Sequence, residues 1–501
     1  MRLRNGQAAP VADVPLLAGD EFRSTVIDAA LGGARVLAFF GQASPDSRGA
    51  VRLWGVLADA LTGDLGLLAT DIAGEIFPSL TPDCPQLHHF ERELLETWRL
   101  APAGHPWLRP VRFPGDRPEG PALAEFYRVA GAEVHEVAVG PVHAGVIEPG
   151  HFRFQCHGER VLHLEIALGY QHRGVERAML EMPSRRRIHY AETLAGDTSV
   201  GHATAYAMAI EALAGVAPPP RAEALRSVGL ELERLANHTG DLGALAGDVG
   251  FLPTAAYCGR LRGDFLNLTA LLCGNRFGRG LVRPGGAGYD VSGALAEQVR
   301  KRLGRAVPDV AGATDLLFDS PSAMARFQGT GRLWRSQAQG LGFVGVAARA
   351  CGMARDVRFE FPAGLWLTRQ IQTATWHSGD VFARALVRRL EIERSVAFVE
   401  EVLADLPEGP IRADLPGGHR VGAPVGPLAG SHVAVALVEG WRGEICHVAV
   451  TDPAGDLAAY KIVDPSFHNW YALQLALRDQ QISDFPLCNK SFNLSYCGAD
   501  L

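Results

Sequence analysis

The chain has 501 residues and a formal net charge of -7, and 47% of its residues are hydrophobic while 21% are charged. These values are typical of a folded globular chain with two to four domains' worth of sequence, and they argue against an intrinsically disordered chain. Its longest basic run is Arg185–Arg187. An acidic chain with so little clustered positive charge is not expected to bind nucleic acid.

Targeting and metal-binding signals are missing from the sequence. No window of about 18 apolar residues predicts a transmembrane helix, and the start lacks the apolar core of a secretory signal, so we expect a cytoplasmic chain. The eight cysteines are scattered without a C-x-x-C pair, which predicts neither a zinc site, an iron–sulfur cluster nor a disulfide framework in this chain. No motif for NAD, a nucleotide or zinc is present.

The first part of the chain reads as a small sheet with a helix. Apolar runs bounded by glycine and turn residues predict strands at 34–40, 51–58 and 65–72. A helical apolar pattern follows at 86–98. Residues 106–121 are rich in proline, glycine and arginine, and we place a domain boundary within them, near residue 120.

The next segment, 139–168, predicts two β-strands that meet at a turn lined by glycine and histidine. Four histidines lie in it: His143, His151, His157 and His163. They fall on separate strands and turns, without the short spacing that aims two ligands at one point, so we do not expect them to bind a metal.

Residues 191–213 read as a tight turn that leads into a buried, alanine-rich helix. Asp197 or Thr198 is predicted to cap this helix by accepting its first free backbone N–H groups. His202 and Glu211 are the ionisable residues on the helix.

Helical periodicity continues to about residue 405 and predicts a bundle, with Gly379–Asp380 capping one of its long helices. Strands return at 432–437, 444–451 and 457–463, the last two joined by a turn at 452–456. The predicted fold class is therefore α+β: a small N-terminal sheet-and-helix domain followed by a mainly helical bundle with small β-sheets.

Nearly the whole chain resembles one family. The segments that carry the resemblance are, in order, GPVHAGVIEPGHFRF, GYQHRGVER, SVGHATAYAMAIEAL, ELERLANHTGDLGAL, GNRFGRGLVRPGG, GDVFARALVRRLEIERS, EGWRGEI and DPSFHNW. They are similar to the large subunit of group 4 membrane-bound nickel–iron hydrogenases of the formate hydrogenlyase subunit 5 type. They also resemble the 49-kDa subunit of respiratory complex I, an NADH-quinone oxidoreductase.

The N-terminal segment SLTPDCPQLHHFERELLETWRLAPAGHPWLRPVRF resembles the 30-kDa subunit of complex I, which formate hydrogenlyase-type proteins carry fused ahead of the large subunit. The resemblance thus implies a 30-kDa-like α+β domain at 1–120 and a hydrogenase large-subunit or 49-kDa-like domain at 121–501.

The nickel cysteines of the hydrogenases are absent from this chain. The family turn E-x-x-C-G-x-C-x-x-x-H runs here from Glu192 to His202, and the C-terminal D-P-C-x-x-C falls within 493–498. The four cysteine positions hold Ala195, Thr198, Ser495 and Gly498. Nickel in that site requires soft thiolate ligands, so the resemblance implies a related form that has lost nickel.

The resemblance also implies a vestigial active-site cavity. In it Glu192, Asp197, Thr198 and His202 face Ser495, Tyr496 and Cys497. Such groups can relay protons or hydrogen-bond a quinone carbonyl. The alternative is that Asp197 and Thr198 are helix caps and that His202 is a satisfied core histidine.

Complex I carries a tyrosine near the quinone headgroup, and that tyrosine falls on Gly196 here. His143 aligns with the first histidine of the G-P-Q-H-P-x-x-H segment of complex I, and His151 reaches the second after a shift of the loop. By resemblance these two histidines lie on the quinone side of the cavity.

His172 and Arg173 match positions that in complex I lie beside the terminal 4Fe–4S cluster of a neighbouring small subunit. A cation there would raise the cluster's potential. The alternative is a surface salt bridge between Arg173 and Glu176. His238 has a similar but weaker claim to the same role.

The first hypothesis for function is a subunit of a membrane-associated oxidoreductase complex. It would take electrons from an iron–sulfur subunit towards a quinone-like acceptor, without nickel and without a cofactor of its own. Antiporter-like membrane subunits would add ion translocation, and the chain would sit peripherally on the cytoplasmic face of the inner membrane. The alternative is a redox-silent structural or coupling subunit, and a minor alternative is an active nickel–iron hydrogenase.

Overall fold

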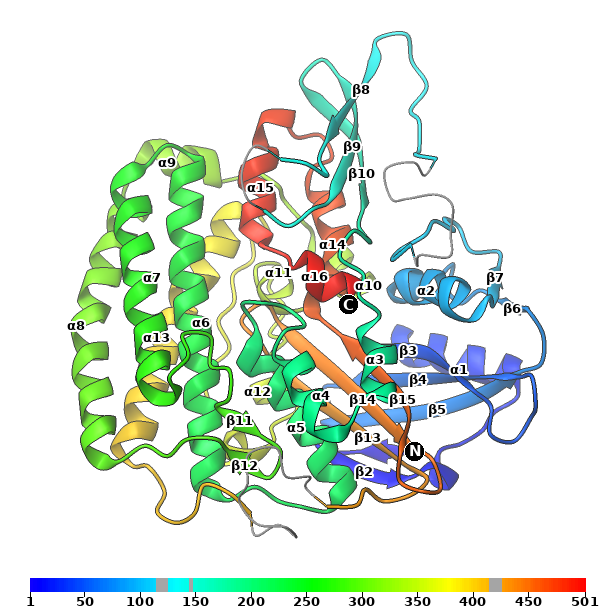
Figure 1. Ribbon diagram of the computed structural model, residues 1–501. Coiled ribbons are helices and arrows are strands. Elements are labelled where there is room, and N and C mark those ends of the chain that lie inside the picture. Colours follow the sequence, from blue (N-terminus) through cyan, green and yellow to red (C-terminus); the bar gives the residue numbers. More distant parts are fainter. Residues whose placement is uncertain (114–124, 144–146, 414–425) are drawn as a thin grey trace.

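The computed structural model describes residues 1–113, 125–143, 147–413 and 426–501. A bundle of long helices occupies the left side of the molecule in Figure 1, and the larger β-sheets lie to its right together with shorter helices. The long helices α6 (Pro220–Asp248), α7 (Leu252–Cys273), α8 (Gly293–Phe318) and α13 (Val381–Ala404) pack side by side, and the β-sheets lie beside them. This mixture of helices and small sheets confirms the predicted α+β class.

The N-terminal unit is a sheet flanked by helices. Its strands are β1 (Arg2–Leu3), β3 (Arg35–Ala43), β4 (Val51–Asp59) and β5 (Asp64–Ile72), all antiparallel in the order β1-β5-β4-β3. Helix α1 (Gly19–Leu31) packs on β5 and β4, and α2 (His88–Trp98) packs on β3. The three predicted strands and the predicted helix are confirmed.

A second antiparallel sheet lies at the centre of the molecule. Its strands are β2 (Gln7–Pro10), β13 (His432–Glu439), β14 (Glu444–Thr451) and β15 (Leu457–Val463), in the order β15-β14-β13-β2. Because side chains alternate along a strand, β13 points Val433, Val435 and Leu437 at the N-terminal sheet. The same strand points Ala434, Ala436 and Val438 at α5 (Ser199–Ala214). The three predicted C-terminal strands are confirmed.

Buried ion pairs join the N-terminal unit to this central sheet. Arg35 binds Glu444, with 2.5 Å between guanidinium nitrogen and carboxylate oxygen, and Lys461 binds Glu93 at 2.6 Å. Strand β2 also belongs to the central sheet although it lies near the start of the chain. The boundary expected near residue 120 falls in 114–124, outside the described residues, so the division into 1–120 and 121–501 stays a prediction.

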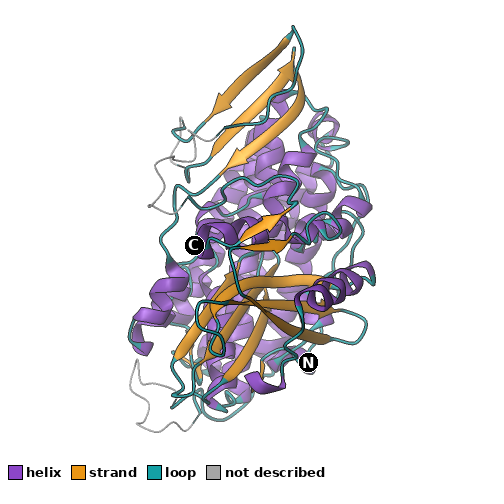
Figure 2. Cartoon of the chain, turned by 90° about the vertical axis from the view of Figure 1, so that its right-hand side faces the viewer, coloured by secondary structure: helices purple, strands orange, loops and turns teal. Residues whose placement is uncertain are grey.

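A third sheet projects from the body of the molecule, as Figure 2 shows. It contains β8 (Val134–Val139), β9 (His151–His157) and β10 (Arg160–Ala167) in the order β10-β9-β8. Strands β9 and β10 form the two-stranded unit predicted in 139–168, and their turn follows His157.

The expected helical middle and C-terminus are also present. Helix α5 packs on β13 and β14, and its Glu211 is paired with Arg226 of α6. Asp380 caps α13 by accepting the backbone N–H of Ala383, as predicted. The chain ends with α14 (Pro465–Ala476), α15 (Phe485–Phe492) and α16 (Tyr496–Asp500).

The shorter elements complete the chain. They are β6 (Ile76–Pro78), β7 (Ala101–Ala103), α3 (Val175–Glu181), α4 (Ser184–Ala191), β11 (Val282–Arg283), β12 (Gly286–Ala287), α9 (Pro321–Phe327), α10 (Arg335–Gly340), α11 (Gly345–Arg349) and α12 (Val357–Glu360), with 3-10 turns at η1 (Val11–Asp13), η2 (Pro85–Leu87), η4 (Gly364–Leu367) and η5 (Ile482–Asp484). Among the described residues, no helix has both the length and the apolar character needed to cross a membrane.

Candidate functional site

The N-terminus of α5 is capped by a residue from a different helix. Glu233 of α6 accepts the backbone N–H groups of Val200 and Gly201 at 2.8 and 3.2 Å. The prediction that Asp197 or Thr198 caps α5 is therefore wrong, and neither side chain accepts a capping hydrogen bond. Burial raises the pKa of Glu233 to about 8, against the effect of the two hydrogen bonds.

Asp197 and Thr198 are instead held by Arg442, in the turn that connects β13 and β14. Two guanidinium nitrogens of Arg442 bind the two carboxylate oxygens of Asp197 at 2.6 and 2.8 Å. The Thr198 hydroxyl accepts hydrogen bonds from Arg442 and from the indole N–H of Trp441. Burial would raise the pKa of Asp197, but the Arg442 charge more than offsets this and holds the pKa below its ordinary value.

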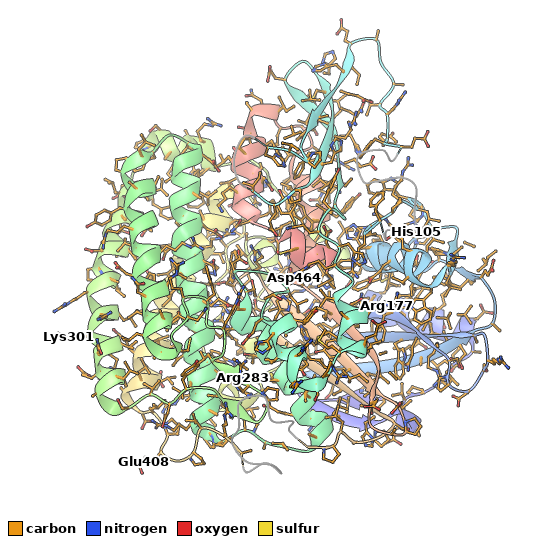
Figure 3. All side chains as sticks on the ribbon, viewed as in Figure 1. His105, Arg177, Arg283, Lys301, Glu408 and Asp464 are labelled. Carbon is orange, nitrogen blue, oxygen red and sulfur yellow. The ribbon has the colours of Figure 1, made fainter. Side chains whose placement is uncertain are left out.

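His202 forms a buried pair with Asp464, the residue that precedes α14. Its Nε2 atom lies 3.0 Å from the Asp464 carboxylate, and its Nδ1 atom lies 3.1 Å from Nε2 of His447. Both ring nitrogens of His202 are thus hydrogen-bonded. Figure 3 shows Asp464 at the centre of the molecule, close to the last helix α16. Burial works to raise the pKa of Asp464, but His202 and Arg442 hold it below its usual value.

The C-terminal segment approaches the turn before α5 through Cys497. The Cys497 thiol is hydrogen-bonded to the backbone of Gly196 and lies near Glu148. Ser495 caps α16 by accepting the N–H of Gly498 at 2.9 Å. The structure therefore brings Cys497 to the Gly196–Asp197 turn, at an edge where Gly196 is exposed and Asp197 is partly exposed.

Tyr496 points away from that edge. Its ring packs against Trp470, with ring centroids 4.7 Å apart, and against Phe152. Its hydroxyl is hydrogen-bonded to Asn489, and burial raises its pKa to about 12. Tyr496 belongs to the hydrophobic core beneath β9 rather than to the group formed by Asp197, Thr198 and Cys497.

Glu192 also faces another part of the molecule. Its carboxylate accepts the backbone N–H of Gly280 at 2.7 Å and binds Arg283 at 2.9 Å. Figure 3 places Arg283 below Asp464. Only the backbone carbonyl of Glu192 reaches the start of α5, where it accepts a hydrogen bond from Ser199.

The two histidines expected on the quinone side both lie against Gly140. His151 donates from Nδ1 to the Gly140 carbonyl at 3.0 Å, and a Cβ atom on Gly140 would lie 2.7 Å from the His143 ring. Nε2 of His143 is buried and has no hydrogen-bond partner among the described residues. Residues 144–146 between these histidines lie outside the described part of the chain.

The other histidines of this region have separate surroundings. His157 pairs with Glu133 at the surface, and the His163 ring packs on Tyr127. Within the described ranges, no group of three or more histidine, cysteine or acidic side chains is arranged to hold a metal ion.

Arg173 ties the turn before α5 to the C-terminus. It donates to the backbone carbonyls of Thr193, Leu194 and Cys497 at 2.9 to 3.3 Å. It does not pair with Glu176, which binds Arg112 and Lys461 instead, so the alternative of an Arg173–Glu176 salt bridge is wrong.

His172 donates from Nδ1 to the backbone carbonyl of Asp500, the residue before the last one, at 2.8 Å. His238 lies elsewhere: it is fully buried on α6, where its Nε2 atom binds Glu391 of α13 at 2.8 Å.

The four positions of the nickel cysteines do not fit a nickel site. Ala195 and Gly498 offer no ligand atom, the Thr198 hydroxyl is bound by Arg442 and Trp441, and the Ser495 hydroxyl caps α16. Cys497 is the one thiol near them within the described residues, and burial followed by the charge of Glu148 raises its pKa to about 11. A neutral thiol is a poor ligand for a soft metal.

The sequence analysis missed the residues that organise this site: Arg442, Trp441, Asp464, His447 and Glu233. A signal for four of them was available, since Trp441 and Arg442 lie in the segment EGWRGEI, Glu233 lies in ELERLANHTGDLGAL and Asp464 begins DPSFHNW, all of which carry the family resemblance. His447 lies outside these segments and no local pattern marks it, because it acts on α5 from a distant part of the chain.

Comparison with known proteins agrees with the resemblance. The profile of the family described as respiratory-chain NADH dehydrogenase, 49 Kd subunit, matches residues 248–421. The carbon monoxide-induced hydrogenase of Rhodospirillum rubrum is 30% identical over 360 residues, which cover 72% of this chain and 97% of that protein.

Two further relatives represent both branches. Hydrogenase-4 component G of Escherichia coli is 29% identical over 445 residues, covering 85% of this chain and 76% of the relative. NADH-quinone oxidoreductase subunit 4 of Thermus thermophilus is 30% identical over 373 residues, covering 70% of this chain and 90% of the relative.

Proposed function

This chain belongs to the family of large subunits that complex I-type NADH-quinone oxidoreductases share with membrane-bound hydrogenases, and from this premise we propose how it acts in such an oxidoreductase complex. It takes electrons from an iron–sulfur partner subunit and passes them to a quinone-like acceptor beside Asp197 and Arg442. It does so without nickel, because the positions of the nickel ligands carry no thiolate.

The hydrogen-bonding state of Arg442 is the observation that carries this proposal. Four of its five N–H groups are taken by Asn493, Asp197 and Thr198 in the described part of the chain, which leaves one on Nη2. A quinone carbonyl oxygen accepts hydrogen bonds, and a buried cation beside it stabilises the negative charge that arrives with an electron. Asp197 and Cys497 are partly exposed, and an acceptor would approach Arg442 from this edge.

The electron donor would dock at the Arg173 side. Arg173 is exposed and its guanidinium joins the turn before α5 to the C-terminal segment. The positive charge of Arg173 would act on a partner iron–sulfur cluster placed there, and the electron would pass from that cluster to the neighbouring site.

The relatives support a membrane-associated setting. They include subunits of NADH-quinone oxidoreductases and a membrane-bound hydrogenase subunit alpha. We propose membrane partner subunits of the complex I or antiporter type, coupling to ion translocation through them, and a peripheral position on the cytoplasmic face of the inner membrane.

The test uses the purified complex. Its clusters are reduced with dithionite, a short-chain ubiquinone is added, and cluster reoxidation is followed by absorbance in the wild type, in Asp197→Ala and in Tyr496→Phe. The control is Asp479→Asn, which alters another aspartate–arginine pair, that of Asp479 with Arg160 at the surface. We expect about tenfold slower reoxidation in Asp197→Ala alone, because Arg442 loses its carboxylate partner.

A redox-silent structural subunit is the second candidate. It is favoured by the two-point pairing of Arg442 with Asp197, which locks the β13–β14 turn to the start of α5. Reoxidation that is absent from the wild type, or equally fast in Asp197→Ala, would overturn the redox proposal in favour of this structural role.

A further inference from the structure

Four buried side chains form a continuous hydrogen-bonded chain through the centre of the molecule. The hydroxyl of Tyr460 on β15 lies 2.8 Å from Nδ1 of His447 on β14. Nε2 of His447 lies 3.1 Å from Nδ1 of His202 on α5, and Nε2 of His202 lies 3.0 Å from the Asp464 carboxylate. None of the four residues is more than 4% exposed. All three links are within ordinary hydrogen-bond distance.

The direction of these hydrogen bonds follows from the chemistry of the end group. An ionised Asp464 can only accept, so Nε2 of His202 donates to it, and a neutral imidazole then accepts at Nδ1. His447 must therefore donate from Nε2 and accept at Nδ1, and Tyr460 donates its hydroxyl proton there. One arrangement with two neutral imidazoles satisfies every atom in the chain.

The electrostatic surroundings agree with that arrangement. Burial lowers the pKa of His447 well below its ordinary value, which keeps its ring neutral. Burial raises the pKa of Tyr460 well above its ordinary value, which keeps its hydroxyl protonated. The pKa of Asp464 is lowered, which keeps it ionised.

The two ends of the chain reach different parts of the molecule. Asp464 touches Gly498 and is close enough to Arg442 and Asp197 for their charges to affect one another, so it belongs to the candidate site. Tyr460 lines a cavity of about 760 Å³ between α2, α3 and β15. Such a cavity has room for water molecules, and polar side chains such as Lys461 line it as well.

We propose that Tyr460, His447 and His202 are a proton relay that carries protons from this cavity to Asp464. The relay rests on the proposed function, because a quinone-like acceptor that takes up two electrons from the iron–sulfur partner also takes up two protons. These residues would act through Asp464 and need not touch the acceptor themselves.

Each passage delivers one proton to the acceptor and takes one proton from water, so the number of protons held by the four side chains does not change. The acceptor takes a proton by way of Asp464, which is resupplied by the Nε2 proton of His202. His202 receives the Nε2 proton of His447 at Nδ1, His447 receives the hydroxyl proton of Tyr460 at Nδ1, and water in the cavity reprotonates Tyr460. Both rings then carry their proton on Nδ1, and each must tautomerise back to the Nε2–H form before the next proton can pass.

The test again uses the purified, dithionite-reduced complex and a short-chain ubiquinone, now in H₂O and in D₂O. His447→Gln keeps both hydrogen bonds, because the amide oxygen accepts from Tyr460 and the amide nitrogen donates to His202, but an amide does not pass protons on. Tyr460→Phe removes the donor at the far end. Tyr206→Phe is the matched control, since the Tyr206 ring lies 6.2 Å from that of Tyr460 and is not part of the hydrogen-bonded series.

We expect reoxidation to be about tenfold slower in His447→Gln and Tyr460→Phe than in the wild type, with a larger solvent isotope effect, and Tyr206→Phe to match the wild type. Equal rates and isotope effects in all four proteins would overturn the relay and leave the proposed function standing. Absence of reoxidation in the wild type would overturn both. If His447→Gln fails to assemble into the complex, Tyr460→Phe decides the question by the same two readouts.

Discussion

The carboxylate of Asp464 fills the space that a side chain on Gly498 would need. A Cβ atom added to Gly498 would lie 2.8 Å from the Asp464 carboxylate carbon and 2.9 Å from the Ser495 hydroxyl oxygen, a separation that real Cβ atoms essentially never show. Glycine at one of the former cysteine positions and the buried Asp464–His202 pair therefore depend on each other. A thiol at residue 498 would require Asp464 to move.

Gly498→Ala is expected to lower the free energy of unfolding by about 1–3 kcal/mol, the usual effect of forcing an extra carbon into a packed interior. Asp464 cannot retreat easily, because it is held by His202 and by the backbone N–H of Ser466. The measurement is the urea midpoint of each variant. Gly259→Ala on α7 is the control, since a Cβ atom there meets nothing within 4 Å. Equal midpoints for the two variants would contradict the crowding at Gly498.

Local sequence patterns predicted the elements of this fold well but could not predict the partners at the site. The apolar run in 432–437 reflects burial of β13 on both faces, and the helical period in 86–98 places Phe90 and Leu94 in one hydrophobic core, features that the chain records locally. The cap of α5 is different. Asp197 has the chemistry of an N-cap, but Arg442 lies 245 residues further along the chain and binds its carboxylate more strongly than backbone N–H groups do.

The same reasoning explains Tyr496. The family resemblance placed residues 495–497 at the cavity as a group, yet consecutive residues at the start of a helix point in different directions. Cys497 therefore reaches Gly196 while the Tyr496 ring turns into the core against Trp470. Resemblance located the segment, and only the three-dimensional structure assigns its side chains.

Glu233 should make the stability of the chain depend on pH. Its pKa is about 8 in the folded chain because of burial, against an ordinary value of 4.5, so the folded state keeps a proton that the unfolded state has released. Stability should then fall as pH rises from about 4.5 to 8, by at most about 1.4 kcal/mol per pH unit, and change no further above that range. Thermal midpoints across this range in Glu233→Gln should fall less than those of the wild type. Glu75→Gln, at an exposed position, should follow the wild type, and parallel curves for all three proteins would show that Glu233 does not titrate in this way.

Lys461 is expected to hold the N-terminal unit against the central sheet. Its side chain is 3% exposed and binds Glu93 of α2 and Glu176 of α3, so Lys461→Met would leave two carboxylates short of a partner. Breaking such a buried pair costs about 3–5 kcal/mol of stability, whereas Arg260→Met, at a surface pair with Asp264, should leave the stability nearly unchanged. Chemical unfolding of both variants measures the difference. A loss in Lys461→Met no greater than that in Arg260→Met would mean that the contact does not tie the two parts together.

Cys497 should react slowly with alkylating reagents, and Glu148 should be part of the reason. The thiolate is the reactive form, and burial followed by the negative charge of Glu148 raises the pKa of Cys497 to about 11, so only a small fraction ionises at pH 8. Glu148→Gln removes that charge and should increase the rate of alkylation by iodoacetamide about threefold to tenfold at pH 8, as followed by peptide mass spectrometry. The other seven cysteines are buried and serve as internal standards. Glu133→Gln is the control for the loss of a carboxylate, because Glu133 pairs with His157 at the surface. An unchanged rate at Cys497 would show that burial alone sets its reactivity, and that the charge of Glu148 does not reach the edge where the proposed acceptor binds.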